Sequence, residues 1–153
     1  MSLRYSEPIA NYTAFKYTLV MIITAAGLLV KDNKLLLGKR QADRAWYPDT
    51  WDLIGGKCES VEPPEQALVR ELQEEIGITP TKYKYIGKLH DLDRNNADEY
   101  EFRMYIVTDW NGTPENRQIH EHSEIGWFTV GDAAILKLAR PEYIGLFKNL
   151  EMP

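Results

Sequence analysis

The sequence predicts an α/β protein with a mixed β-sheet and helices on its faces. Apolar stretches rich in β-branched residues recur along the chain, and such stretches are typical of buried strands. One stretch between a proline pair and a glycine has the spacing and the end signals of a helix. Because these strands and helices alternate irregularly, we expect a mixed sheet covered by helices.

The first strands are expected before residue 55. Residues 17–30 form a long apolar stretch that predicts a buried strand, and Asp32-Asn33 is a turn signal. Residues 34–40 then read as its hairpin partner. A polar and aromatic loop at residues 41–50 leads into a short strand at residues 51–54.

The clearest helix is expected at residues 65–76. Pro63-Pro64 stands where a helix begins, since proline lacks an N–H that the first turn cannot use, and Gly77 stands where it ends. The later elements are expected in this order: strands at 83–89 and 99–110 around a polar loop at 91–98, a strand at 125–130, and helices at 132–139 and 142–150.

The length of 153 residues fits a single domain. Residues 1–16 show no clear period, so we expect an N-terminal extension followed by one domain at residues 17–153. Apolar residues make up 44% and charged residues 27%, which argues against a disordered or collagen-like chain. The net charge of −5 argues against a polymeric nucleic acid as partner, because binding its phosphates normally needs positive charge.

The expected location is cytoplasmic, with no membrane partner. The one cysteine, Cys58, allows no internal disulfide and suits a reducing setting. The fourteen apolar residues at 17–30 fall short of the roughly 20 that cross a bilayer. The first residues also lack the charged head and apolar segment of a signal peptide.

Three carboxylates of the predicted helix share one face. At about 100° per residue, Glu71, Glu74 and Glu75 lie beside the apolar stripe that must face the core. Like charges at this spacing repel one another, and a hard divalent cation such as Mg²⁺ or Mn²⁺ would neutralise them. Taken alone, such a cluster is more often a solvated acidic face, so both interpretations stay open at this point.

The residues around this helix carry a longer pattern. They fit G-x5-E-x7-R-E-U-x-E-E-x-G-U, with U aliphatic, at every defined position: Gly56, Glu62, Arg70, Glu71, Leu72, Glu74, Glu75, Gly77 and Ile78. This segment resembles the Nudix box, and its flanking residues resemble the MutT-like branch of that family. The resemblance implies a Nudix-type α/β/α sandwich with the box as a loop–helix–loop. It also implies a hydrolase that cleaves the diphosphate linkage of a small nucleoside diphosphate-type substrate.

The same resemblance implies roles inside the box. Glu74 and Glu75 would be the main ligands of Mg²⁺, or of Mn²⁺, helped by the carbonyl of Gly55. Glu71 would be a ligand through water or the base that activates the attacking water.

Two further residues of the box would support this site. Arg70 would orient Glu71 through a charge-assisted hydrogen bond. Glu62 would support the metal cluster.

A further ligand is expected outside the box. The MutT-like branch has a metal-binding glutamate six residues before a tryptophan, which here is Glu121 before Trp127, with Glu124 as the rival. Whether Glu71 or Glu121 is the base stays open. With carboxylates available for the metal, we expect structural or surface roles for the three histidines: His90, His120 and His122.

The substrate is less well defined by the sequence. Arg40 stands where the MutT-like branch has an arginine that contacts the nucleotide, although a surface charge at a strand end is an equal alternative. The chain departs from that branch by Ile54 in place of a proline and by the aromatic residues Trp46, Tyr47 and Trp51. These aromatics could stack on a base, or they could be core and loop anchors.

The default function is therefore hydrolysis of a nucleoside triphosphate to a nucleoside monophosphate and pyrophosphate. The MutT-like branch has an asparagine that reads an oxidised guanine, and this chain has no clear counterpart near residues 140–142, so 8-oxo-dGTP is not predicted in particular. The alternatives are a nucleotide sugar or dinucleotide as substrate, and a non-catalytic nucleotide sensor, which would be expected to lose carboxylates of the box. Many relatives are dimers, which leaves a homodimer open.

Overall fold

The computed structural model describes residues 20–92 and 98–153. The predicted extension at residues 1–16 lies outside this part of the chain, as do the start of the predicted strand at 17–30 and most of the predicted loop at 91–98.

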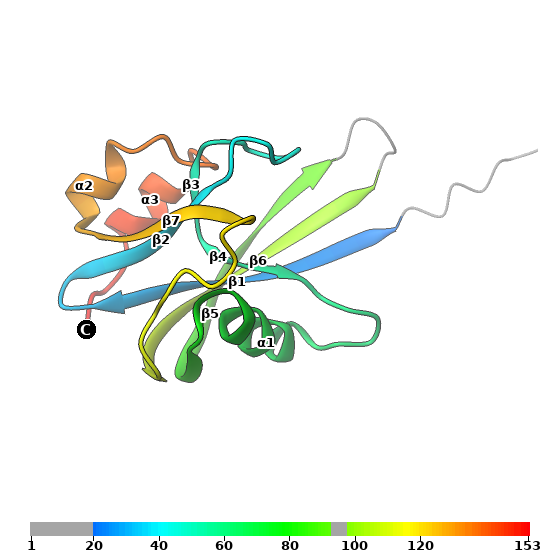
Figure 1. The fold of residues 1–153 in the computed structure, drawn as a ribbon, viewed down its shortest axis with the longest axis horizontal. Coiled ribbons are helices and arrows are strands. Elements are labelled where there is room, and N and C mark those ends of the chain that lie inside the picture. The colour runs from blue at the N-terminus through cyan, green and yellow to red at the C-terminus, as the bar shows by residue number, and fades with distance from the viewer. Residues whose placement is uncertain (1–19, 93–97) are drawn as a thin grey trace, which may run out of the picture.

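The described strands form one mixed sheet, as predicted (Figure 1). At its centre, β1 (Met21–Lys31) pairs antiparallel with β2 (Lys34–Arg40) and β4 (Ile54–Lys57), and parallel with β6 (Glu99–Asn111). The outer strands are β3 (Trp51–Asp52) and β7 (His122–Phe128), which pair with β2, and β5 (Thr79–Leu92), which pairs with β6.

Three helices cover this sheet within the described residues: α1 (Pro64–Ile76), α2 (Val130–Ala134) and α3 (Tyr143–Lys148). Figure 1 shows α1 on one side of the sheet and α2 with α3 on the other. The predicted α/β/α sandwich is therefore confirmed. None of the described helices is long and apolar enough to cross a membrane.

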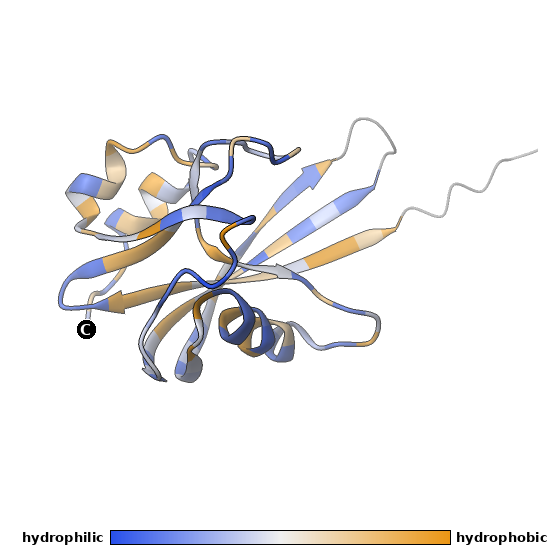
Figure 2. Ribbon diagram, viewed as in Figure 1, coloured by the Kyte–Doolittle hydropathy of each residue, from blue (hydrophilic) through white to orange (hydrophobic). Residues whose placement is uncertain are grey.

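The alternation of side chains along β1 explains the three layers. Ala25 and Leu29 belong to one buried cluster with apolar residues of α1, whereas Ala26 and Leu28 belong to another with residues of α2 and α3. Successive residues of a strand point to opposite faces, so β1 contributes to both cores. Figure 2 shows the result as hydrophobic colour concentrated on β1 and β2, with hydrophilic colour on much of α1.

Two predicted strands have different bounds in the structure. The expected strand at residues 51–54 is divided at Leu53, because β3 pairs with β2 whereas β4 pairs with β1. The expected strand at 83–89 is longer and runs over Thr79–Leu92. This longer strand includes Pro80; β5 ends the sheet order and shifts its register beside this proline, which edge strands tolerate.

The last elements are also displaced from their predicted bounds. β7 begins at His122 rather than at residue 125, because it follows β2 as far as Arg40. α2 begins early, where the Thr129 side chain accepts a hydrogen bond from the Asp132 amide. It also ends early, because the following segment bridges to β3, where the Ala139 amide donates to the Trp51 carbonyl. α3 is shorter than predicted at both ends.

The packing of α3 leads to a prediction about stability. Tyr143 is fully buried, and its hydroxyl donates a hydrogen bond to Asp52 Oδ1. Tyr143→Phe is expected to lower the free energy of unfolding by about 1–3 kcal/mol, because a buried carboxylate loses a donor. Urea denaturation measures this change. The exposed Tyr83→Phe is the control and should be near neutral; equal effects of the two variants would contradict the role given to the buried hydroxyl.

Candidate active site

The helix α1 begins and ends where the sequence predicts. Pro64 stands at its first turn, and Gly77 ends it with a left-handed φ of 71°, a conformation that glycine adopts without strain. Its three carboxylates differ in exposure. The side chain of Glu75 is 3% exposed, that of Glu71 12% and that of Glu74 48%. They therefore lie at the edge of the core, as the helical spacing predicted.

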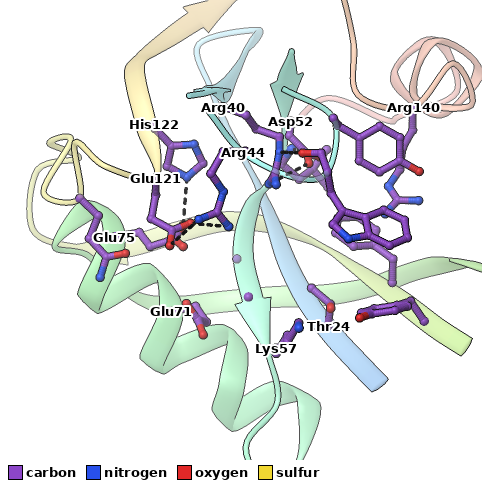
Figure 3. Close-up of a pocket in the computed structure, with 18 of the residues that line it drawn as sticks. Thr24, Arg40, Arg44, Asp52, Lys57, Glu71, Glu75, Glu121, His122 and Arg140 are labelled. Carbon is purple, nitrogen blue, oxygen red and sulfur yellow. Dashed lines mark hydrogen bonds and ion pairs between the residues drawn. The ribbon is translucent and has the colours of Figure 1, made fainter. Parts of the chain in front are cut away.

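These carboxylates face a cavity of about 530 Å³ (Figure 3). One end of the cavity is acidic and is lined by Glu71, Glu74, Glu75 and Glu121. The other end is formed mainly by aromatic rings and one arginine that contact one another: Trp46, Tyr47, Tyr100, Phe102 and Arg140. Figure 3 shows Arg140 on the side of the cavity that lies away from Glu75.

Two glycines of β4 allow the backbone to approach α1 and β1. A Cβ atom on Gly56 would lie 2.4 Å from the carboxyl carbon of Glu71. A Cβ atom on Gly55 would lie 2.0 Å from the carbonyl oxygen of Ala25. The glycine pair is therefore needed at two contacts, one with a candidate site residue and one with the central strand.

Arg70 connects the carboxylates of the box. Its Nη1 atom donates to Glu71 Oε1 at 2.8 Å and lies 3.3 Å from Glu74 Oε2. Its Nε and Nη2 atoms donate to the two oxygens of Glu62 at 2.8 and 2.9 Å. These bonds hold the pKa of Glu62 down at about 2. Glu62 lies outside the described cavity lining, so its contact with the site passes through Arg70.

The electrostatics of Glu71 and Glu75 differ from those of Glu62. Burial raises the pKa of Glu71 to about 7; the hydrogen bond from Arg70 opposes this rise, and the nearby carboxylates of Glu75 and Glu74 add to it. Burial also raises the pKa of Glu75, against a hydrogen bond from His122. Both carboxylates are held where ionisation is unfavourable, which is common in functional sites.

The structure gives His122 a place that sequence reasoning did not assign. Its Nε2 atom lies 3.2 Å from Glu75 Oε2, and both side chains are buried. The ring packs on Gly38, where a Cβ atom would lie 2.8 Å from Nδ1. His120 lines the cavity as well. The alternation of His120, Glu121 and His122 was the available signal, since it brackets a candidate ligand.

Outside the box, the structure places one of the two rival glutamates at the cavity. Glu121 lines it and forms an ion pair with Arg44 at 3.3 Å, whereas Glu124 is exposed on β7 outside the described lining. Arg40 also lines the cavity; its Nε atom donates to the Trp46 carbonyl, and its Nη1 atom lies 3.9 Å from Asp52 Oδ2.

Comparison with known proteins identifies the family. A family model described as the NUDIX domain matches residues 21–150. The chain belongs to the Nudix family. The predicted enzyme class, a Nudix hydrolase of phosphorus anhydrides, is thereby confirmed.

The relatives include MutT-like Nudix hydrolases. A protein of Escherichia coli (strain K12) named CTP pyrophosphohydrolase is 36% identical over 121 residues, which cover 78% of this chain and 84% of the relative. A second protein of that organism, named 8-oxo-dGTP diphosphatase, is 36% identical over 101 residues, which cover 61% and 71%. The solution structure of the E. coli ORF135 protein has a TM-score of 0.71 at 31% identity and covers 86% of this chain and 89% of that chain.

The donors of this Nudix site fit a hard divalent cation. Within the described residues, no three acidic, histidine or cysteine side chains already lie together as a metal site requires, and Arg70 bridges two of the carboxylates. The donors that α1 and β4 bring to the cavity are nevertheless all oxygens: those of Glu71, Glu74 and Glu75 and the carbonyl of Gly55. Carboxylate and carbonyl oxygens suit Mg²⁺ or Mn²⁺.

A prediction follows for the buried pair of His122 and Glu75. His122→Ala is expected to raise the Mn²⁺ concentration for half-saturation by about 10- to 100-fold, because an orienting partner of a ligand is lost. Electron paramagnetic resonance of Mn²⁺ measures free metal without relying on turnover. His90→Ala, on an exposed residue outside this cavity, is the control. Unchanged affinity in a folded His122→Ala protein would show that Glu75 needs no such partner.

Proposed function

We propose that this Nudix protein is a divalent-metal-dependent hydrolase that converts a nucleoside triphosphate to a nucleoside monophosphate and pyrophosphate. One observation carries the proposal: the carboxylates of α1 and the backbone of β4 border one end of a cavity whose other end is aromatic. A site of this kind suits a substrate with a polyphosphate at one end and a flat ring at the other.

The names of the relatives support a triphosphate. Two of the curated relatives are named CTP pyrophosphohydrolase and 8-oxo-dGTP diphosphatase. They differ in base, so the class of nucleoside triphosphates is proposed here rather than one member of it.

In this proposal Glu71 is the base. It is the carboxylate with a pKa near 7, and Arg70 fixes one of its oxygens, so the other is free to take a proton from water. Glu74, Glu75 and the Gly55 carbonyl are the proposed ligands of the cation. When bound, Mg²⁺ or Mn²⁺ neutralises the polyphosphate and polarises its P–O bonds.

The remaining residues have supporting roles in the proposal. Glu121 completes the ligand set when Arg44 releases it, and Arg40 binds the phosphates. Glu71 removes a proton as the water oxygen bonds to a phosphorus of the α–β linkage. The bridging P–O bond breaks, and its electron pair leaves with one of the two products. The reaction thus consumes one water and needs no other reactant.

A substrate screen tests the proposal. Phosphate release is measured with Mg²⁺, with added pyrophosphatase for normal and oxidised nucleoside triphosphates and with added alkaline phosphatase for nucleotide sugars and dinucleotides. Glu74→Gln is run beside the wild type. The expected result is turnover of triphosphates that the variant loses. Turnover of sugars or dinucleotides alone would contradict the proposed substrate. Nucleotide binding without any turnover would contradict catalysis and favour a sensor.

Three wider features also belong to the proposal. The one cysteine of the sequence, Cys58, supports a reducing, cytoplasmic setting. A single domain over residues 17–153 and a homodimer are predictions that the resemblance supports. Light scattering of the purified protein measures whether it is a dimer.

A further inference from the structure

A second cavity lies behind the aromatic end of the candidate active site. It has a volume of about 370 Å³, and its lining includes Lys88, His90 and Pro141. It shares three lining residues with the first cavity: Tyr47, Asp91 and Arg140. These three side chains therefore stand between the two cavities.

The three shared residues are bonded to one another. The Tyr47 hydroxyl donates to Asp91 Oδ1 at 3.1 Å, and Arg140 Nη1 pairs with Asp91 Oδ2 at 2.5 Å. The Arg140 guanidinium also lies over the Tyr47 ring, 5.1 Å from its centroid, and over the Phe102 ring at 4.3 Å. These contacts join three segments: strand β5, the loop that precedes β3, and the segment that precedes α3.

This contact is formed despite two local costs. Tyr47 has a φ of 49°, in the left-handed region that bulky residues rarely adopt. Arg140 is 8% exposed, and its Nε atom is buried without a hydrogen-bond partner in the part of the chain that the structure describes. Strain and unpaired donors of this kind are concentrated where proteins bind ligands.

The loop that carries Tyr47 is itself held in place. Arg40 donates to the Trp46 carbonyl at 2.8 Å, and the Thr50 hydroxyl donates to the Tyr47 carbonyl at 2.6 Å. The Tyr47 ring is therefore fixed from both its backbone and its hydroxyl.

We infer that Tyr47, Asp91 and Arg140 form a partition that sets the length of the substrate. The partition ends the active cavity after one nucleoside, so that a substrate whose polyphosphate joins two bulky groups does not fit. This inference rests on the proposed function and deepens it, since the partition would select mononucleotides over dinucleotides as substrates. The second cavity is the space that a second nucleoside reaches when the partition is removed.

The test compares two substrates on variants of the partition. The ratio of kcat/KM for GTP to that for diguanosine tetraphosphate is measured for the wild type, Tyr47→Ala, Tyr47→Phe and Arg140→Ala. Tyr85→Ala is the matched control, because Tyr85 is exposed and lines neither described cavity. Circular dichroism checks the folding of each variant.

The wild type is expected to prefer GTP. Tyr47→Ala is expected to lower the ratio of kcat/KM for GTP to kcat/KM for diguanosine tetraphosphate by at least about tenfold, mainly through a lower KM for the dinucleotide. Arg140→Ala should also lower this ratio. Tyr47→Phe, which keeps the ring, and Tyr85→Ala should retain the wild-type ratio. An unchanged ratio in folded Tyr47→Ala and Arg140→Ala proteins, or a wild type that prefers the dinucleotide, would overturn the inference.

A binding measurement separates this inference from the proposed function. The dissociation constants of the same two nucleotides are measured by calorimetry with Mg²⁺ on a Glu71→Gln background. If the wild type hydrolysed no nucleoside triphosphate in the substrate screen, the proposed function would fail. The ratio of dissociation constants, with and without Tyr47→Ala, would still decide whether the partition acts.

Discussion

Glu71→Gln is expected to lower kcat for triphosphate hydrolysis by about 100- to 10,000-fold, the range that the loss of a general base produces. The amide still accepts the hydrogen bond from Arg70, so the side chain should stay in place without being able to take a proton. Steady-state kinetics at saturating Mg²⁺ measure the effect, because excess metal compensates for weaker binding.

Glu121→Gln decides between the two candidate bases. If Glu121 is only a ligand, its replacement should raise the Mg²⁺ requirement and leave most of kcat at saturating metal. Glu124→Gln, on the exposed neighbour outside the described cavity lining, is the matched control and should behave as the wild type. A greater loss of kcat for Glu121→Gln than for Glu71→Gln would move the base to Glu121.

The raised pKa of Glu71 predicts how metal binding depends on pH. Its protonation removes a negative charge beside the proposed cation ligands Glu74 and Glu75, and in the free protein its pKa is about 7. The half-saturating Mg²⁺ concentration should therefore rise as the pH falls from about 8 to about 6. Glu71→Gln should bind metal more weakly at the upper pH and show a flatter dependence. An equally steep dependence in this variant would assign the proton to another group.

The second large effect is expected at Gly56. In Gly56→Ala the new methyl group would overlap the Glu71 carboxylate, which is the end of a flexible side chain and can move away. The protein should fold, but the displaced carboxylate should lower kcat/KM by about 100-fold, the effect that about 1 Å of misplacement produces. Kinetics together with a thermal melt measure the two consequences separately.

Gly55→Ala is the matched comparison. Its methyl group would overlap the Ala25 carbonyl in the backbone of β1, which cannot move without disturbing the sheet. This variant is therefore expected to lose stability as well as activity. Full activity in Gly56→Ala, or a melting temperature as low as that of Gly55→Ala, would contradict the separation of roles between the two glycines.

The helix and its carboxylates were predictable because their signals are local. The proline pair, Gly77 and the helical spacing fix where α1 begins and ends and which face carries Glu71, Glu74 and Glu75. The bounds of β3, β4, β5 and α2 were less predictable, because partners distant in sequence decide them. The edge position of β5 admits Pro80, and the contact with Trp51 ends α2.

The wider site also combines features that a local signal predicts with features that depend on residues distant in sequence. The cavity position of Glu121 agrees with its spacing from Trp127, which is a signal in the sequence. The contact of His122 with Glu75 joins residues 47 positions apart, and Tyr47 meets Asp91 across 44 positions. No local pattern encodes these contacts, since they arise only when three segments converge on one cavity: β5, β7 and the loop that precedes β3.

The most direct test of the central claim is the ³¹P nuclear magnetic resonance spectrum of a nucleoside triphosphate incubated with the protein. The account predicts signals of nucleoside monophosphate and pyrophosphate that appear only with Mg²⁺ or Mn²⁺ and are lost with Glu71→Gln. Release of orthophosphate and nucleoside diphosphate, or undiminished turnover by Glu71→Gln, would contradict it.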